Sequence, residues 1–127
     1  MSKKFYTGDC HDLIKELAGN SVDMIYINPP FATTANDWDK KLRWKELFPE
    51  MHRVVKPSGN IVIHTAVPFM YEIVGYEKPN YHFAWQKTRP TGHLNAKKEP
   101  LRDIEEILVY KNSPKAQYFP QMKGEEE

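Results

Sequence analysis

One short stretch, Asp23-Met24-Ile25-Tyr26-Ile27-Asn28-Pro29-Pro30-Phe31, constrains this chain more than any other. Its apolar residues predict a buried strand that runs straight into two prolines. Each proline fixes its own φ, removes a backbone N–H and favours an extended conformation in the residue before it. The stretch therefore predicts a strand that ends in a rigid loop, with Asn28 and Phe31 held just beyond its carboxyl end. In open α/β sheets, ligands bind at that end.

The side chains of this loop suit a planar heterocycle that carries an exocyclic amine. The side-chain carbonyl of Asn28 and the backbone carbonyl of Pro29 can both accept hydrogen bonds from such an amine. The ring of Phe31 can stack on the base. Two acceptors would orient the nitrogen lone pair towards an electrophile, which is catalysis by positioning. The structural alternative is that the prolines end a strand and Phe31 fills a core.

The sequence around this loop narrows the choice. Asn28-Pro29-Pro30-Phe31 resembles the catalytic motif of S-adenosylmethionine-dependent amino-methyltransferases. The stretches Gly8-Asp9-Cys10 and Asn20-Ser21-Val22-Asp23, together with 54–59, resemble the beta-class DNA methyltransferases. Residues 87–98 and 100–109 resemble the adenine-N6 members of that class. The likeness extends from about Phe5 to about Met122.

The resemblance implies a role for each matching residue. Asn28, Pro29, Pro30 and Phe31 would hold a flipped adenine and present its N6 amine to the methyl group of S-adenosylmethionine. Asp9, with Cys10 beside it, would contact the cofactor, although Asp9 is equally well placed to cap the helix that follows. Cytosine-N4 methylation uses the same geometry, commonly with serine in place of Asn28, and remains the nearest chemical alternative.

The most basic segment lies between residues 87 and 102, which contain five lysine or arginine residues and one acidic residue. By composition alone, a solvated loop is the simpler interpretation. The resemblance instead implies contact with the target strand of double-stranded DNA, since lysine and arginine bind phosphates. The residues assigned to DNA binding are Arg89, Thr91, His93, Asn95, Lys97, Lys98 and Arg102.

Hydrophobic patterning predicts one α/β domain over residues 1–122, followed by an acidic, disordered tail at 123–127. The expected fold is a partial Rossmann-like methyltransferase sheet with an antiparallel strand pair at one edge. Residues 32–41 form an expected lid, in which Trp38 serves as a packing anchor rather than a base contact. The expected elements are strands at 5–7, 24–27, 60–64, 81–87 and 104–110, helices at 11–18, 42–55 and 68–75, with a start or kink near Pro49, and a tight turn at 56–59.

The chain departs from the family in one respect. A glycine-rich loop for the methionine part of the cofactor is absent, and only six glycines occur in the sequence. The strand at 24–27 would then keep an unpaired edge, which invites pairing with another chain. We therefore expect a complementary methyltransferase fragment, a homodimer through this edge, or a piece of a longer enzyme. A non-catalytic DNA-binding or partner subunit is the alternative function.

Composition excludes several other classes. The net charge is only +1, so any affinity for DNA must come from uneven charge distribution. No apolar run is long enough to cross a bilayer, and we expect a cytoplasmic protein without a membrane partner. The single cysteine, Cys10, cannot form an intrachain disulfide. No metal site is expected, because Cys10 and His11 lack further ligands at metal-binding spacing.

Overall fold

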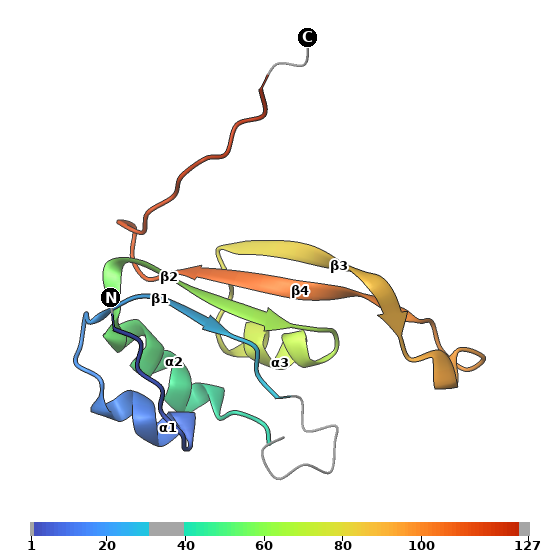
Figure 1. The fold of residues 1–127 in the computed structure, drawn as a ribbon, viewed down its shortest axis with the longest axis horizontal. Coiled ribbons are helices and arrows are strands. Elements are labelled where there is room, and N and C mark those ends of the chain that lie inside the picture. Colours follow the sequence, from blue (N-terminus) through green and yellow to red (C-terminus); the bar gives the residue numbers. More distant parts are fainter. Residues whose placement is uncertain (1, 31–39, 125–127) are drawn as a thin grey trace.

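The structure, a computed structural model, describes residues 2–30 and 40–124 (Figure 1). The elements in chain order are α1 (Cys10–Leu13), a 3-10 turn (Ile14–Glu16), β1 (Val22–Ile27), α2 (Trp44–Val54), β2 (Val55–Thr65), α3 (Phe69–Tyr76), β3 (Tyr81–Thr91), a second 3-10 turn (His93–Asn95) and β4 (Arg102–Lys111). Phe31 and Trp38, the predicted base platform and lid anchor, lie outside the described residues. So does most of the predicted acidic tail.

The described strands form a single four-stranded sheet in the order β1-β2-β4-β3. β1 runs parallel to β2, whereas β4 is antiparallel to both β2 and β3. The predicted α/β fold with an antiparallel pair at one edge is therefore confirmed. At the other edge lies β1, which pairs with β2 alone among the described strands, as the sequence led us to expect.

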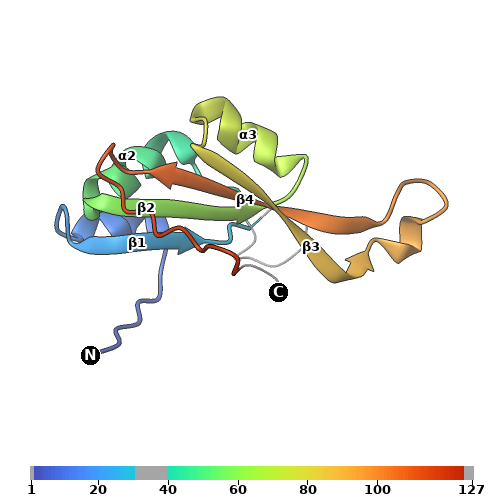
Figure 2. The same ribbon diagram turned by 90° about the horizontal axis from the view of Figure 1, so that it is seen from above.

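The described helices all lie on one side of the sheet (Figures 1 and 2). They cover the face that carries the apolar core, and no helix in residues 2–30 or 40–124 covers the opposite face. We call that opposite side of the sheet the open face. No helix among the described residues is both long and apolar enough to cross a membrane.

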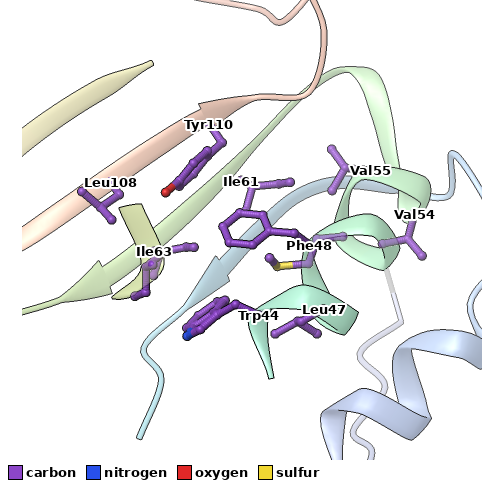
Figure 3. Packing of buried hydrophobic residues seen from close by; sticks show 11 residues of the cluster. Trp44, Leu47, Phe48, Val54, Val55, Ile61, Ile63, Leu108 and Tyr110 are labelled. Atoms are coloured by element: carbon purple, nitrogen blue, oxygen red, sulfur yellow. The ribbon is translucent and has the colours of Figure 1, made fainter. Parts of the chain in front are cut away.

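The core forms where α2 packs on β2 and β4 (Figure 3). The apolar residues of α2 recur at the three- and four-residue spacing of one helical face, which explains why this segment is helical and which side it buries. Phe48 lies at the centre, with its ring centroid 5.3 Å from that of Tyr76 and 5.1 Å from that of Tyr110. The buried residues are Trp44, Leu47, Phe48, Met51, Val54, Val55, Ile61, Ile63, Ile73, Leu108 and Tyr110.

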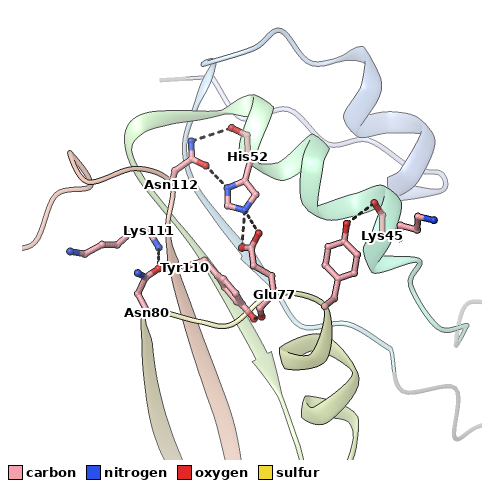
Figure 4. Close-up of polar contacts among 8 residues, drawn as sticks. Lys45, His52, Glu77, Asn80, Tyr110, Lys111 and Asn112 are labelled. Atoms are coloured by element: carbon pink, nitrogen blue, oxygen red, sulfur yellow. Dashed lines mark hydrogen bonds and ion pairs between the residues drawn. The ribbon is translucent and has the colours of Figure 1, made fainter.

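α2 begins at Trp44 and continues through Pro49, so the prediction that it begins near this proline is wrong. The alternative, a kink near Pro49, stays a prediction. Proline has no N–H to donate to the carbonyl four residues earlier, here that of Lys45. The hydroxyl of Tyr76 donates to this carbonyl instead, at 3.2 Å (Figure 4). A side chain from α3 thus replaces the missing backbone hydrogen bond.

The far end of α2 is fastened to the sheet by polar contacts (Figure 4). The side-chain amide of Asn112 donates to the backbone carbonyls of His52 and Val55, at 3.1 and 2.7 Å. The His52 ring lies between Asn112 Oδ1, at 2.7 Å, and the Glu77 carboxylate, at 2.9 Å. These contacts satisfy carbonyls that the end of the helix leaves without intrahelical partners.

Two local predictions near β1 are wrong. Residues 5–7 form no strand and pair with none of the described strands, and Phe5 is 90% exposed. Residues 56–59, predicted as a turn, belong to β2, where they make a bulge that shifts the register with β1. Gly59 is required there, since a Cβ atom would lie 2.4 Å from the carbonyl oxygen of Asp23.

The predicted helix at 11–18 is shorter than expected. α1 ends at Leu13, and the chain continues as a 3-10 turn through Glu16. Gly19 and Asn20 form a turn, in which Asn20 adopts a positive φ of 53°. This conformation suits asparagine and returns the chain into β1.

Candidate functional site

The Asn-Pro-Pro turn follows directly on β1, as predicted. Asn28 is exposed and Pro29 is buried, while Pro30 is partly buried. Ile25 and Ile27 pack towards the core, so strand alternation places Tyr26 and then Asn28 on the open face. Ile27 is level with Ile63 of β2, which brings Asn28 beside His64. The structure therefore presents the Asn28 amide at the carboxyl ends of two parallel strands.

The two prolines rest on a small hollow of about 20 Å³. It has room for about one water molecule and is far too small for a nucleobase. Any base must therefore bind above the turn rather than beneath it. The residues that line the hollow are Pro29, Pro30, Lys41, Leu42, Trp44, Thr65, Phe69, Glu72 and Ile73.

Asp9 has the capping role that the sequence allowed. Its carboxylate accepts hydrogen bonds from the backbone N–H of His11 at 2.8 Å and from His11 Nδ1 at 2.6 Å. These hydrogen bonds hold the pKa of the Asp9 carboxyl below its usual range, and the one from the His11 ring has the larger effect. Asp9 is therefore ionised near neutral pH, with one oxygen committed to His11. Its contact with a cofactor stays a prediction.

His11 is a functional candidate that the sequence did not reveal. It is 5% exposed, and its Nε2 accepts a hydrogen bond of 2.9 Å from the backbone N–H of Arg43. Because Nε2 is an acceptor, the ring proton lies on Nδ1 and points at Asp9. His11 thus joins the Asp9 carboxylate to the segment that enters α2.

A second cavity, of about 450 Å³, lies between Asp9 and the Asn-Pro-Pro turn. Its walls bring the predicted cofactor residues, Asp9 and Cys10, to the same space as Pro30. Such a cavity can accept part of a nucleoside, with the Asp9 carboxylate as a hydrogen-bond acceptor. The lining residues are Gly8, Asp9, Cys10, His11, Pro30, Lys40, Lys41, Leu42 and Arg43.

Asp9, Cys10 and His11 also offer potential metal-ligand atoms within 4.8 Å of one another. Both ring nitrogens of His11 are already engaged in hydrogen bonds. Burial, followed by the charge of Asp9, raises the pKa of the Cys10 thiol, which disfavours the thiolate that binds metals. We therefore assign no metal to this cluster.

The predicted DNA-binding residues lie along a hairpin that extends beyond the rest of the sheet (Figures 1 and 2). All seven of their side chains are exposed. Thr91 pairs with Arg102 at the base of the turn, and Lys87 Nζ donates to Thr91 Oγ1 at 2.9 Å. Lys97 and Lys98 lie between the second 3-10 turn and β4. The structure therefore brings Thr91 and Arg102 together at the base of the turn and places Lys97 and Lys98 beyond them in the turn itself.

A groove of about 440 Å³ joins this hairpin to the end of β2. Lys87, Thr91 and Arg102 line it on the hairpin side, and Ala66 and Phe69 line it on the other. Phe69 also lines the hollow beneath Pro29 and Pro30. The two predicted regions, turn and hairpin, are thus connected along one surface.

Three further polar residues on the open face were not singled out from the sequence. Tyr26 Oη lies 2.6 Å from His64 Nδ1, and His64 Nε2 contacts the Glu105 carboxylate. These residues come from β1, β2 and β4. The one available signal was a polar side chain at an alternating position within otherwise apolar strands.

Comparison with known proteins identifies the family. The DNA methylase model for N6 and N4 enzymes matches residues 22–127. This chain belongs to the DNA methylase family. The match begins at β1 and includes the Asn-Pro-Pro turn and the basic hairpin, which confirms the family predicted from the sequence.

Among curated relatives, this DNA methylase is 28% identical over 137 residues to the type II methyltransferase M.BglII of Bacillus subtilis. That alignment covers 91% of the chain and 37% of M.BglII. M.BamHI of Bacillus amyloliquefaciens is 34% identical over 71 residues, which are 48% of the chain and 17% of the relative. The chain thus spans little more than a third of M.BglII.

Solved structures share the fold of this DNA methylase. The M1.HpyAVI–SAM complex superposes with a TM-score of 0.63 at 23% identity, covering 96% of the chain and 62% of that structure. The cytosine-N4-specific PvuII DNA methyltransferase superposes with a TM-score of 0.64 at 13% identity, covering 88% and 50%. Neighbours of this kind confirm the Rossmann-like methyltransferase fold.

Proposed function

We propose that this chain provides the catalytic turn of an S-adenosylmethionine-dependent DNA methyltransferase that acts on the N6 amine of adenine. The position of Asn28 carries the proposal. Its amide follows a rigidly ended strand and lies exposed beside the end of β2, and the hollow beneath the two prolines that follow it is too small to admit a base. The family match supports methyl transfer to DNA as the reaction class. The resemblance of residues 87–109 to the adenine-N6 members supports adenine as the target base.

The residues of the turn act by holding and orienting the target. The Asn28 side-chain oxygen and the Pro29 carbonyl accept hydrogen bonds from the two amine hydrogens, so the nitrogen lone pair points away from both. Phe31 stacks on the flipped base in this proposal. S-adenosylmethionine, when bound, supplies an electrophilic methyl group. The chain's own contribution is therefore geometry, and Asn28 takes no proton.

The cavity between Asp9 and Pro30 fits one part of the cofactor. An ionised carboxylate with one oxygen held by His11 keeps acceptor capacity for the hydroxyl or amino groups of a nucleoside. Asp9 and Cys10 would hold that part next to the catalytic turn. None of the described cavities offers residues for the methionine part of the cofactor. This agrees with the absence of the glycine-rich loop from the sequence.

The open face and the β1 edge point to a partner. Met24 and Tyr26 of β1 and Phe83 and Trp85 of β3 expose large apolar surfaces. We propose that a complementary methyltransferase segment pairs with the free edge of β1, since the chain spans 50% to 62% of the superposed structures. Sedimentation of the purified chain tests this: a homodimer that buries Tyr26 would replace the complementary segment as occupant.

The remaining predictions of partner and place belong with this function. Double-stranded DNA is the proposed substrate, contacted along the basic hairpin, and the cytoplasm is the proposed location. The restriction-modification setting follows from the type II names of the relatives.

A methylation assay tests the catalytic proposal. Duplex DNA is incubated with the chain and labelled S-adenosylmethionine, and the modified bases are identified by mass spectrometry. Asn28→Ala should lower methyl transfer by about 100-fold or more, because one of two acceptors is lost. Asn28→Asp, which keeps an acceptor, is the matched control and should retain more activity.

Each remaining outcome selects another function. N4-methylcytosine without N6-methyladenine would select the cytosine alternative, which the superposition on the PvuII enzyme favours. DNA binding without any transfer, unchanged in Asn28→Ala, would select the non-catalytic binding subunit.

A further inference from the structure

A chain of three polar side chains crosses the open face beside Asn28. The Tyr26 hydroxyl lies 2.6 Å from His64 Nδ1, and His64 Nε2 contacts the Glu105 carboxylate. His64 is largely shielded, with its side chain 13% exposed, whereas Tyr26 is 55% exposed. The chain therefore has a protected middle and an accessible end.

The hydrogen-bonding capacity of each group gives this chain a direction. A carboxylate only accepts, so His64 Nε2 carries the proton that it donates to Glu105. His64 Nδ1 is then an acceptor, and the Tyr26 hydroxyl donates to it. Hydroxyl, imidazole and carboxylate in this order form the arrangement in which a side-chain base withdraws a proton from a hydroxyl.

The accessible end of the chain lies near the reacting amine of the proposed function. Strand register places Asn28 level with His64, and adjacent strands are separated by about 4.8 Å. The Tyr26 side chain starts two residues before Asn28 on the same face and leans forward to reach His64. Its hydroxyl therefore lies at His64, the residue that follows the β2 partner of Ile27, while Asn28 follows Ile27 itself.

The proposed reaction needs a proton acceptor that the catalytic turn does not supply. An amine that has gained a methyl group carries a positive charge and one proton too many. The amide oxygen of Asn28 and the carbonyl of Pro29 accept hydrogen bonds but are too weakly basic to keep that proton. A base within reach must remove it.

We propose that Tyr26, His64 and Glu105 form the relay that takes up this proton, an inference that rests on the proposed function. The N–H bond of the methylated amine breaks, and its electron pair stays on nitrogen. The Tyr26 oxygen receives the proton while the hydroxyl's own proton passes to His64 Nδ1. The Glu105 carboxylate stabilises the resulting imidazolium. Tyr26 is the catalytic residue of this step, and His64 and Glu105 are positioning residues.

The surroundings of His64 favour this direction of transfer. From β4 it faces Glu105, and from β3 Lys87 Nζ lies 3.9 Å from the other Glu105 oxygen. From β1 it faces only the Tyr26 hydroxyl. The Trp85 ring, with its centroid 6.1 Å away, shields one side. One negative charge in contact with the ring stabilises its cationic form.

The test compares wild-type chain with Tyr26→Phe and His64→Gln in the methylation assay. Both variants should lower kcat by about 100-fold while KM for DNA and for S-adenosylmethionine stays within twofold. In the wild type, kcat should fall on the acid side as the imidazole takes up a proton, and His64→Gln should abolish this dependence. His82→Gln is the matched control, because His82 contacts Glu106 on an exposed part of β3.

Unchanged kcat and an unchanged pH profile in both variants would overturn the relay. Should the wild-type chain transfer no methyl group, the proposed function fails in this chain, and imidazole ¹⁵N shifts of the same sample judge the relay separately. A protonated Nε2 and an unprotonated Nδ1, with the Nδ1 shift altered in Tyr26→Phe, support it. A proton on Nδ1 at neutral pH overturns it.

Discussion

Thr65 carries a buried hydroxyl group that needs a hydrogen-bond partner. It is 1% exposed at the end of β2, and within residues 2–30 and 40–124 its hydroxyl oxygen has no hydrogen-bond partner. The side chain lines the hollow beneath the catalytic prolines. A buried polar group without a partner costs about 1–3 kcal/mol. The free energy of unfolding is therefore lower than it would be with an apolar side chain in place of Thr65.

Replacing this hydroxyl should therefore stabilise the fold. Thr65→Val keeps the shape of the side chain and should raise the free energy of unfolding by about 1 kcal/mol, measured by urea denaturation. Thr65→Ser keeps the hydroxyl, loses a methyl group and should lower that free energy. A loss of stability in the valine variant would mean that the hydroxyl has a partner.

His11 can be tested through the pKa of Asp9. Replacing the ring by Gln should raise that pKa towards its usual value of 3.8, measured by carbon NMR, because the ring N–H is the main cause of the depression. A depressed carboxyl pKa stabilises the fold above the unfolded-state pKa, and this contribution is lost as pH falls through the folded-state value. The stability advantage of wild type over His11→Gln should thus narrow below about pH 4. His93→Gln, on the exposed hairpin, should show no such change.

At the scale of elements, α2 illustrates how a neighbour can rescue an unfavourable local sequence. Proline inside a helix costs about 3 kcal/mol, partly through the lost hydrogen bond to the preceding turn. Here Tyr76 of α3 donates to the Lys45 carbonyl that Pro49 leaves unpaired. The Tyr76 ring also stacks on Phe48, so the same residue serves the core. The Tyr76 hydroxyl therefore couples α3 to α2.

A double-mutant cycle measures that coupling. Tyr76→Phe should lower the free energy of unfolding by about 0.5–1 kcal/mol, since it removes the hydroxyl and keeps the stacked ring. In a Pro49→Ala background, the alanine N–H can reach the Lys45 carbonyl, and Tyr76→Phe should then cost less. Equal costs in both backgrounds would show that the hydroxyl does not compensate for the proline.

For the whole molecule, the distribution of charge matters more than its sum. The net charge is +1, yet five basic residues lie between positions 87 and 102, on a hairpin that extends away from the helices. Binding of DNA phosphates releases counterions in proportion to the cations in contact. The hairpin therefore sets the salt dependence of DNA binding in our proposal.

Salt titrations test this assignment. The slope of the logarithm of the binding constant against the logarithm of salt concentration should shrink by about 1.8 in Lys97→Ala/Lys98→Ala, for two lost phosphate contacts. Lys3→Ala/Lys4→Ala removes the same charge from the N-terminal segment and should leave the slope unchanged. Equal changes in both pairs would point to a general charge effect rather than hairpin contact.

Sequence reasoning succeeded where the cause was local. Asp9 caps α1 because a carboxylate there reaches the free N–H groups of the first turn, and the apolar spacing of α2 places one face on the sheet. It failed where distant contacts decided the outcome. Residues 5–7 have strand-forming side chains but pair with none of the described strands. Residues 56–59 have the composition of a turn, yet they join β2 through a bulge that Gly59 permits.

The candidate site divides in the same way. The sequence by itself determined that a strand ends at Asn28, because two prolines fix φ and remove the N–H groups that would continue the ladder. Only the tertiary structure decided that β4 lies between β2 and β3. This order brings Glu105 to His64 and His64 to Tyr26, which are 41 and 38 residues apart in the chain. Such pairings depend on strand register, which is set by the packing of the whole sheet.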